Sequence, residues 1–344
     1  MSGGRRRDFL AVLGAAAAAA GLSACTPRMI PMGPPVGEPS LAEDALVMAD
    51  GARLPLRKWL PTGGRPPRAV ILALHGFNEY ARSFAEDPAP LFTAAGVAVY
   101  AYDQRGFGQA PHRGIWAGAE TLAHDASTAA RLIRARHPGV PLILLGESMG
   151  ASVIMVAAAS AEPPQVDGYV LLAPAVWGRN TMPALVRWVL DAAARTIPLV
   201  AFRNTAGGIT PTDNIERLQR WSRDPLIIRE TRVDAAKGLV DLMDEAVAAA
   251  PRFGTTSLRH PPTLLLYGAQ DQLVPPGPTR QVLRSLPASA RARVGYYLEG
   301  HHQLLRDRNG PVVVRDILAW IENPSAPLPS GADTVARAWL AEEA

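Results

Sequence analysis

Short apolar runs alternate with amphipathic stretches along most of the chain. Six runs of four to six residues carry few or no charges, which is typical of strands buried on both faces of a sheet. They are Ala69–Leu74, Val97–Tyr102, Leu142–Leu145, Tyr169–Leu172, Thr263–Tyr267 and Val294–Tyr297. Helical patterns lie between or after them, notably at Glu120–Arg136, Ala151–Ala161, Pro276–Leu286 and Val312–Ile321. This alternation predicts an α/β fold with a mostly parallel, doubly wound sheet covered on both faces.

Two segments depart from this alternation. Asp50-Gly51 stands between two strand-like runs, which predicts a tight hairpin and an antiparallel edge. Residues 176–255 contain helical stretches at Pro183–Arg195 and Arg232–Ala250 and no convincing strand. We expect them to form an all-helical insertion that covers the carboxyl ends of the strands as a cap. Ligands bind at those strand ends in open α/β sheets.

The N-terminus has the features of an export signal. Three arginines at residues 5–7 precede an Ala-rich apolar stretch that is too short and too weakly apolar for a comfortable membrane span. The sequence RRDFL resembles a twin-arginine export motif, and LSAC, ending at Cys25, resembles a bacterial lipobox. We therefore expect residues 1–24 to be an export signal and Cys25 to be lipidated. An uncleaved anchor, an ordinary signal or a buried structural cysteine are the alternatives.

Lipidation would make the protein a bacterial lipoprotein held at a membrane surface on the periplasmic side. Thr26 rather than Asp follows the cysteine, so the outer membrane is a plausible destination. Residues 25–41 are proline-rich and predict an extended tether. The α/β core should then occupy 42–175 and 256–322, with a C-terminal tail at 323–344.

Composition and charge narrow the function classes. The 344 residues are 48% hydrophobic and 19% charged, an ordinary globular composition that can bury a large core. The formal net charge of +4 falls to about +2 without residues 1–24, and no basic patch points to nucleic acid. Cys25 is the only cysteine in the sequence, so no internal disulfide can form.

The clearest chemical motif is Gly-Glu-Ser-Met-Gly at residues 146–150, between the strand at 142–145 and a helix. This context predicts a nucleophile elbow, in which the two glycines allow a sharp turn and Ser148 is exposed in a strained conformation. The helix that follows offers free N–H groups, among them that of Met149, to an oxyanion. The alternative is a serine that merely caps the helix.

A reactive serine needs a base and an acid that orients the base. Asp271 follows a predicted strand and precedes a proline-started helix, so it is a candidate acid or, alternatively, a helix cap. His301 and His302 follow the last predicted strand, and either could be the base. The order Ser, acid, His is the one expected on this kind of sheet. The backbone N–H of Phe77, after the His75-Gly76 that ends another strand, is the candidate second oxyanion donor.

These motifs together resemble the monoacylglycerol lipase and lysophospholipase branch of the α/β-hydrolases, also described as serine aminopeptidase S33-type. The resemblance covers about residues 44–322 and rests on HGFNE, YDQRGFG, GESMG, GxxD and HQLLRD. It implies Ser148 as nucleophile, Asp271 as acid and His302 rather than His301 as base, because the family follows its histidine with x-Leu-x-x-acid. It implies neither metal nor cofactor. The family often has His where this chain has Glu147, a difference that the sequence does not explain.

Single-chain lipid esters are the expected substrates, and the membrane surface is the expected partner. Trp177, Leu185, Trp188, Val189 and Leu190 could line an apolar entrance in the cap, or could pack the cap's own core. Alternatives within the superfamily are a peptidase or amidase and an acyltransferase. The alternative outside enzymes is a noncatalytic surface lipoprotein.

Overall fold

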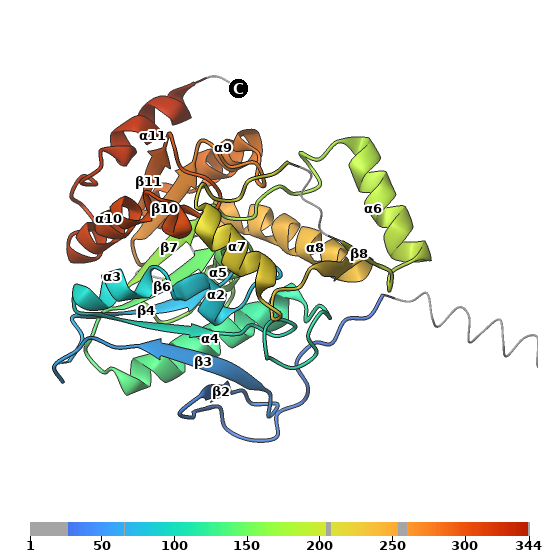
Figure 1. Cartoon of the computed structure of the whole chain (residues 1–344), viewed down its shortest axis with the longest axis horizontal. Coiled ribbons are helices and arrows are strands. Elements are labelled where there is room, and N and C mark those ends of the chain that lie inside the picture. The colour runs from blue at the N-terminus through green and yellow to red at the C-terminus, as the bar shows by residue number, and fades with distance from the viewer. Residues whose placement is uncertain (1–26, 65, 204–207, 254–259, 343–344) are drawn as a thin grey trace, which may run out of the picture.

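A nine-stranded sheet organises the protein in a computed structural model that describes residues 27–342 except 65, 204–207 and 254–259. The expected signal at 1–24 and Cys25 lie outside the described residues. The strand order is β1-β2-β3-β5-β4-β6-β7-β10-β11 (Figure 1). The strands are β1 (Ser40–Leu41), β2 (Ala45–Val47), β3 (Arg53–Trp59), β4 (Ala69–Leu74), β5 (Val97–Tyr102), β6 (Leu142–Glu147), β7 (Gly168–Leu172), β10 (Thr263–Gly268) and β11 (Ala292–Tyr297).

The six predicted buried strands form the parallel part of the sheet, from β5 to β11. The first three strands pair antiparallel, and β3 joins them to β5. The predicted hairpin is confirmed: Gly51 has φ of 80°, and its N–H donates to the carbonyl of Met48 at 2.9 Å. Because the strands from β5 to β11 are parallel, the carboxyl ends of β4, β6 and β10 share one edge of the sheet, as the sequence predicts.

Successive side chains of each strand point to opposite faces of the sheet. Both faces are apolar, and helices cover both. Val70, Leu72 and Leu74 belong to one hydrophobic cluster, and Ile71 and Ala73 belong to the other. The first cluster includes α4 (Ala119–Arg136), α5 (Met149–Ala158) and α9 (Pro276–Ser285), and the second includes α2 (Ala81–Ala85), α3 (Ala89–Ala94) and α10 (Gly310–Glu322). The sheet is thus covered on both faces, as predicted.

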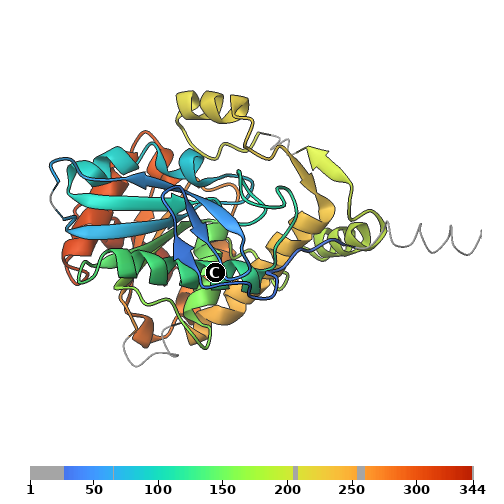
Figure 2. The same ribbon diagram turned by 90° about the horizontal axis from the view of Figure 1, so that it is seen from below.

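The insertion between β7 and β10 contains three helices and also two short strands. The helices are α6 (Ala184–Thr196), α7 (Ile215–Arg223) and α8 (Val233–Ala249), and η1 (Ala250–Arg252) follows. The strands β8 (Ala201–Arg203) and β9 (Glu230–Arg232) pair antiparallel, so the expectation of an all-helical cap is wrong in this respect. The three residues of β8 are exposed and too few to show an alternating pattern. In Figure 2, α6 lies beyond the layered core, while α7 lies over a different part of it.

Both ends of the described chain pack on the rest of the fold, the N-terminal end on the insertion and the core and the C-terminal end on the core. The expected tether is extended but attached, because the N–H of Arg28 donates to Asp234 at 2.9 Å and that of Ile30 to the carbonyl of Trp116 at 2.9 Å. The C-terminal segment forms α11 (Ala332–Ala341), whose Trp339 stacks on Tyr296 of β11 with ring centroids 4.4 Å apart. None of the helices in the described ranges has the length and apolar character needed to cross a membrane.

Candidate active site

The turn from β6 to α5 holds Ser148 in a conformation that side chains rarely adopt. Its φ is 53° and its ψ is −115°, a combination that type II′ turns usually reserve for glycine. The flanking glycines permit the turn. A Cβ on Gly146 would lie 2.5 Å from the carbonyl carbon of Gly150, and a Cβ on Gly150 would lie 2.3 Å from the carbonyl oxygen of Leu74. The predicted elbow geometry is therefore present, with Ser148 half-buried at the edge of the sheet.

Asp271 and His302 meet, although 31 residues separate them in the sequence. Oδ2 of Asp271 lies 2.8 Å from Nδ1 of His302, and its Oδ1 accepts backbone N–H bonds from Leu273 and Val274 at 2.8 and 3.0 Å. Asp271 thus orients the imidazole and also shapes its own loop. Nδ1 is occupied, so Nε2 is the ring nitrogen left for a nucleophile.

The environment of His302 favours the charged imidazolium. Burial disfavours the charge, but the charge and hydrogen bond of Asp271, together with Glu147, outweigh burial and raise the pKa of His302. A buried base with a raised pKa retains a proton more readily once it has received one. This is the property that a general base needs during proton transfer.

The neighbouring His301 is bound to a different carboxylate. Its backbone N–H donates to Oδ2 of Asp307 at 2.7 Å, and its ring Nδ1 lies 3.5 Å from the same oxygen. Asp213, His301 and Asp307 are the one group in the described ranges whose ligand atoms are close enough for a metal ion, within 4.8 Å of one another. Both oxygens of Asp307 already accept backbone hydrogen bonds, the second from Asp213 at 3.3 Å. We therefore interpret these contacts as structural: they hold the loop that carries His301 and His302 against the cap.

The loop after β4 lies beside the serine. A Cβ on Gly76 would be 3.6 Å from the Cβ of Ser148, so Phe77, the next residue, begins close to the nucleophile turn. His75 is fully buried and has a structural role: its Nδ1 lies 2.8 Å from the Gly76 carbonyl, and its Nε2 accepts the N–H of Gln104 at 3.0 Å. Met149 is the first residue of α5, where N–H groups lack intrahelical partners. The two candidate oxyanion donors thus belong to two segments that both adjoin Ser148.

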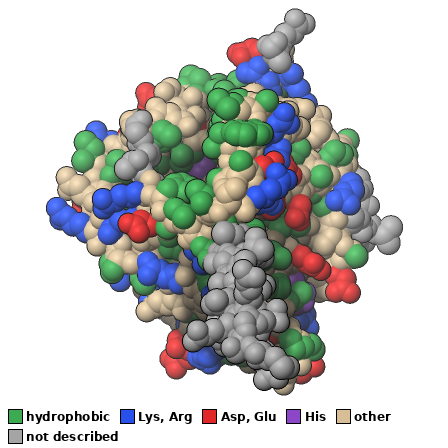
Figure 3. Space-filling view, turned by 90° about the vertical axis from the view of Figure 1, so that its right-hand side faces the viewer, with side chains coloured by type: hydrophobic (Ala, Val, Ile, Leu, Met, Phe, Trp, Pro, Cys, Tyr) green, Lys and Arg blue, Asp and Glu red, His purple; other side chains and the backbone are tan. Residues whose placement is uncertain are grey.

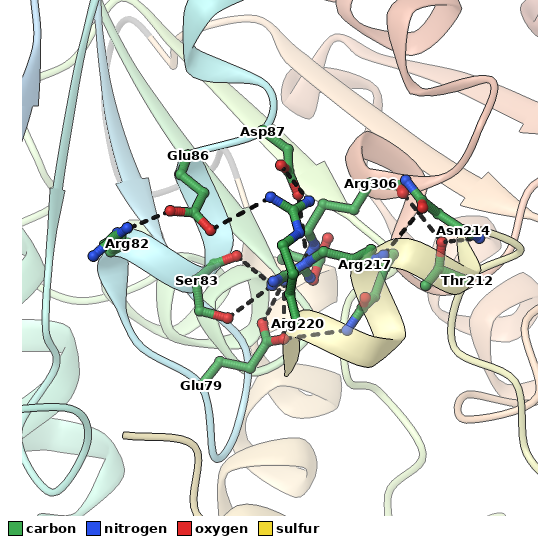
Figure 4. A network of polar contacts seen from close by, with 12 residues as sticks. Glu79, Arg82, Ser83, Glu86, Asp87, Thr212, Asn214, Arg217, Arg220 and Arg306 are labelled. Carbon is green, nitrogen blue, oxygen red and sulfur yellow. Dashed lines mark hydrogen bonds and ion pairs between the residues drawn. The ribbon is translucent and has the colours of Figure 1, made fainter. Parts of the chain in front are cut away.

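A buried charge cluster beneath these segments was not predicted from the sequence. Arg306, in η3 (Leu304–Arg306), donates from Nη1 to both oxygens of Glu79 at 2.9 Å and from Nη2 to Oε1 of Glu147. All three side chains are at most 6% exposed. Figure 4 shows Glu79 and Arg306 in one network of polar contacts with Ser83 of α2 and Arg217 of α7. The only signal in the sequence was a charge inside an apolar run, once in the strand at 142–147 and once in the segment at 304–306.

The two glutamates differ in their ionisation. Burial would raise the pKa of Glu79, but Arg306 and Arg217 outweigh burial and lower it. Burial raises the pKa of Glu147 to about 7 against the attraction of Arg306, and the nearby charge of Glu79 adds to the rise. Across the described ranges, Oε2 of Glu147 has no hydrogen-bond partner. Glu147 therefore accepts fewer hydrogen bonds than Glu79 and ionises less readily.

Comparisons with known proteins agree with this geometry. Residues 65–309 match the family described as "Serine aminopeptidase, S33". A monoacylglycerol lipase of Mycolicibacterium smegmatis is 25% identical over 285 residues, covering 81% of this chain and 96% of the relative. The human monoglyceride lipase is 30% identical over 233 residues, covering 66% of this chain and 73% of the relative.

Solved structures show the same fold at lower identity. The monoacylglycerol lipase of Paleococcus ferrophilus superposes with a TM-score of 0.63 at 22% identity, covering 78% of this chain and 98% of that one. A soluble variant of the Saccharomyces cerevisiae monoglyceride lipase gives 0.65 at 18% identity, covering 88% and 99%. With the family match spanning most of the chain, the protein belongs to the serine aminopeptidase S33 family of α/β-hydrolases.

Proposed function

We propose that the protein hydrolyses carboxylic esters through an acyl-enzyme on Ser148, with His302 as general base and Asp271 as the residue that orients it. The observation that carries this proposal is the 2.8 Å contact between Asp271 and His302 at the sheet edge where Ser148 is held in its strained turn. Neither feature is needed for packing alone, and together they match the requirements of nucleophilic catalysis.

The proposed reaction has two halves, acylation of Ser148 and hydrolysis of the acyl-enzyme. Nε2 of His302 takes the proton of the Ser148 hydroxyl as the oxygen attacks the ester carbonyl, and the imidazolium then protonates the departing alcohol. Water attacks the acyl-enzyme with the same base, which returns the proton to Ser148. The negative oxygen of each tetrahedral intermediate would accept hydrogen bonds from the backbone amides of Phe77 and Met149. Loss of one such donor typically costs about 3 kcal/mol of transition-state stabilisation.

Single-chain lipid esters are the proposed substrates. Relatives in several organisms are named monoacylglycerol or monoglyceride lipases. The cap supports an apolar substrate, because Leu185, Trp188 and Val189 of α6 are 70%, 68% and 51% exposed. These three side chains do not pack a core of the cap, whereas Trp177 and Leu190 of the same predicted set are half-buried. Figure 3 shows hydrophobic side chains gathered on the face that carries α6.

We also propose that the protein is an exported lipoprotein, held at the membrane by acyl chains on Cys25. The tether ends close to the cap, since Arg28 binds Asp234 at the start of α8. Acyl chains three residues upstream would therefore place the cap near a lipid surface. Mass spectrometry of the mature N-terminus, after expression in a bacterium with lipoprotein processing, tests this: an unmodified Cys25 would refute it.

Fluorophosphonate labelling tests the enzyme proposal directly. The folded wild type should form an adduct on Ser148, and Ser148→Ala should form none. Absence of labelling in the folded wild type would favour a noncatalytic surface lipoprotein.

Substrate class requires a second assay, because the matched family is described as aminopeptidases. p-Nitrophenyl esters of increasing chain length should turn over faster than aminoacyl anilides, and monoacylglycerols should release fatty acid. Faster turnover of the anilides would replace the ester proposal with a peptidase or amidase. Transfer of the acyl group to added glycerol in preference to water would replace it with an acyltransferase.

A further inference from the structure

Glu147 connects the segment of the proposed nucleophile with the segment of the proposed base. It ends β6 and directly precedes Ser148, and its carboxylate binds Nη2 of Arg306, four residues after His302. The same guanidinium binds Glu79, two residues after Phe77. One buried arginine therefore joins the three segments that carry the nucleophile, the base and an oxyanion donor.

The two carboxylates that bind Arg306 differ in the number of hydrogen bonds that they accept. Glu79 accepts two hydrogen bonds from Arg306 and a third from Gln303 at 3.2 Å, and it also faces Arg217 of the cap. Glu147 has a single partner and a second oxygen that accepts no hydrogen bond among the described residues. When Glu147 is ionised, part of its negative charge is thus left to act on other groups, and His302 is one of them.

We propose that Glu147 is a positioning residue for the base: through Arg306 it holds the His302 loop against the nucleophile turn, and its carboxylate stabilises the imidazolium that forms when Nε2 takes the Ser148 proton. This inference rests on the proposed function, which makes His302 the base. Asp271 supplies the contact on Nδ1, and Glu147 adds a second negative charge without occupying a ring nitrogen. The proton still passes between Ser148 and His302, and Glu147 takes no part in the transfer.

The groups that face the pair determine the expected pH dependence. Glu147 faces Arg306, Glu79, His302 and Arg217. The groups that act on His302 are Asp271, Glu147 and Arg306. Replacing Glu147 removes a negative charge that favours the imidazolium. Replacing Glu79 leaves that charge in place and frees Arg306 and Glu147 to pair, so Glu147 ionises more completely.

Glu147→Gln and Glu79→Gln form a matched pair, because each removes one carboxylate from the same guanidinium. NMR titration of the His302 ring in folded protein, assigned with His302→Ala, reads the effect without requiring turnover. We expect Glu147→Gln to lower the pKa of His302 by about 0.5–1 unit. Glu79→Gln should leave the pKa unchanged or raise it.

Activity supplies the second readout. In Glu147→Gln the acidic limb of kcat/KM should move to lower pH by the same amount, and kcat should fall about threefold to tenfold. Glu147→Asp, which keeps the charge, should restore the wild-type limb. A shift in the same direction in both Gln variants, or none in Glu147→Gln, would overturn the inference.

The two possible failures are distinguishable. A wild type that neither labels nor turns over ester loses the proposed function, whereas an active wild type with an unmoved His302 pKa in Glu147→Gln loses only this inference. If Glu147→Gln does not fold, Glu79→Gln still decides the sign, because a lowered His302 pKa in that variant contradicts the assigned role.

Discussion

The strain at Ser148 can be measured by comparing two substitutions that both remove the hydroxyl. Its φ of 53° and ψ of −115° cost a residue with a Cβ about 1–3 kcal/mol, whereas glycine adopts them freely. Glycine also gains about 0.4–1 kcal/mol of entropy in the unfolded chain, which opposes the effect. Ser148→Gly should therefore exceed Ser148→Ala in stability by about 1 kcal/mol, or about 2 °C in melting temperature for a domain of this size.

Urea unfolding of both variants, followed by tryptophan fluorescence, gives the comparison. Since neither variant has the hydroxyl, the difference isolates the backbone, and both should lose fluorophosphonate labelling. Ser148→Gly would then be more stable than the wild type while inactive, the pattern expected where strain is retained for function. If Ser148→Ala equals or exceeds Ser148→Gly in stability, the turn is not strained and the elbow argument fails.

Three further predictions concern the surroundings of the site. Gly150→Ala places a Cβ 2.3 Å from the carbonyl oxygen that ends β4, so it should destabilise the fold by roughly 3 kcal/mol in urea unfolding. The control is Gly277→Ala in α9, whose Cβ would meet nothing within 4 Å and which should be neutral or slightly stabilising. His302→Ala should reduce kcat/KM for esters by several orders of magnitude and His301→Ala by far less, and the reverse order would exchange their roles. Burial lowers the pKa of His260 to about 4, so the unfolded chain binds its proton first as the pH falls below 6.5. Between pH 7 and pH 5 this residue should cost about 2 kcal/mol of stability, which His260→Phe should abolish in urea titrations at the two pH values.

The sequence predicts best those parts in which neighbouring residues share one environment. Ala69–Leu74 and Val97–Tyr102 are buried on both faces along their whole length, and the structure has these strands at the predicted bounds. The order Ser, acid, His points to Asp271 and to a histidine at 301 or 302, and the resemblance to the family then favours His302, which is the histidine that contacts Asp271. The strands β8 and β9 could not be predicted, because a strand of three residues is too short to show a period, and the residues of β8 are all exposed.

The charge cluster was beyond prediction for a different reason. Glu147 and Arg306 are 159 residues apart, and nothing in either local pattern names the other as partner. Each lies in an apolar segment where a charge is unfavourable unless it is paired. A buried charge in such a segment therefore predicts that a partner exists, but only the folded chain identifies it.

Stability alone does not account for three buried charges in this place. Replacing a buried ion pair with apolar residues is often neutral or stabilising, because the desolvation penalty offsets the attraction between the charges. The segments that Arg306 joins meet at the carboxyl edge of the sheet, where Glu147 is the last paired residue of β6, and Glu79 and Arg306 lie beyond the ends of their strands. Apolar packing would tolerate small shifts among them, whereas an arginine that binds Glu79 and Glu147 through directed hydrogen bonds admits few arrangements. In the proposed mechanism, the cluster would fix the distances on which proton transfer between Ser148 and His302 depends.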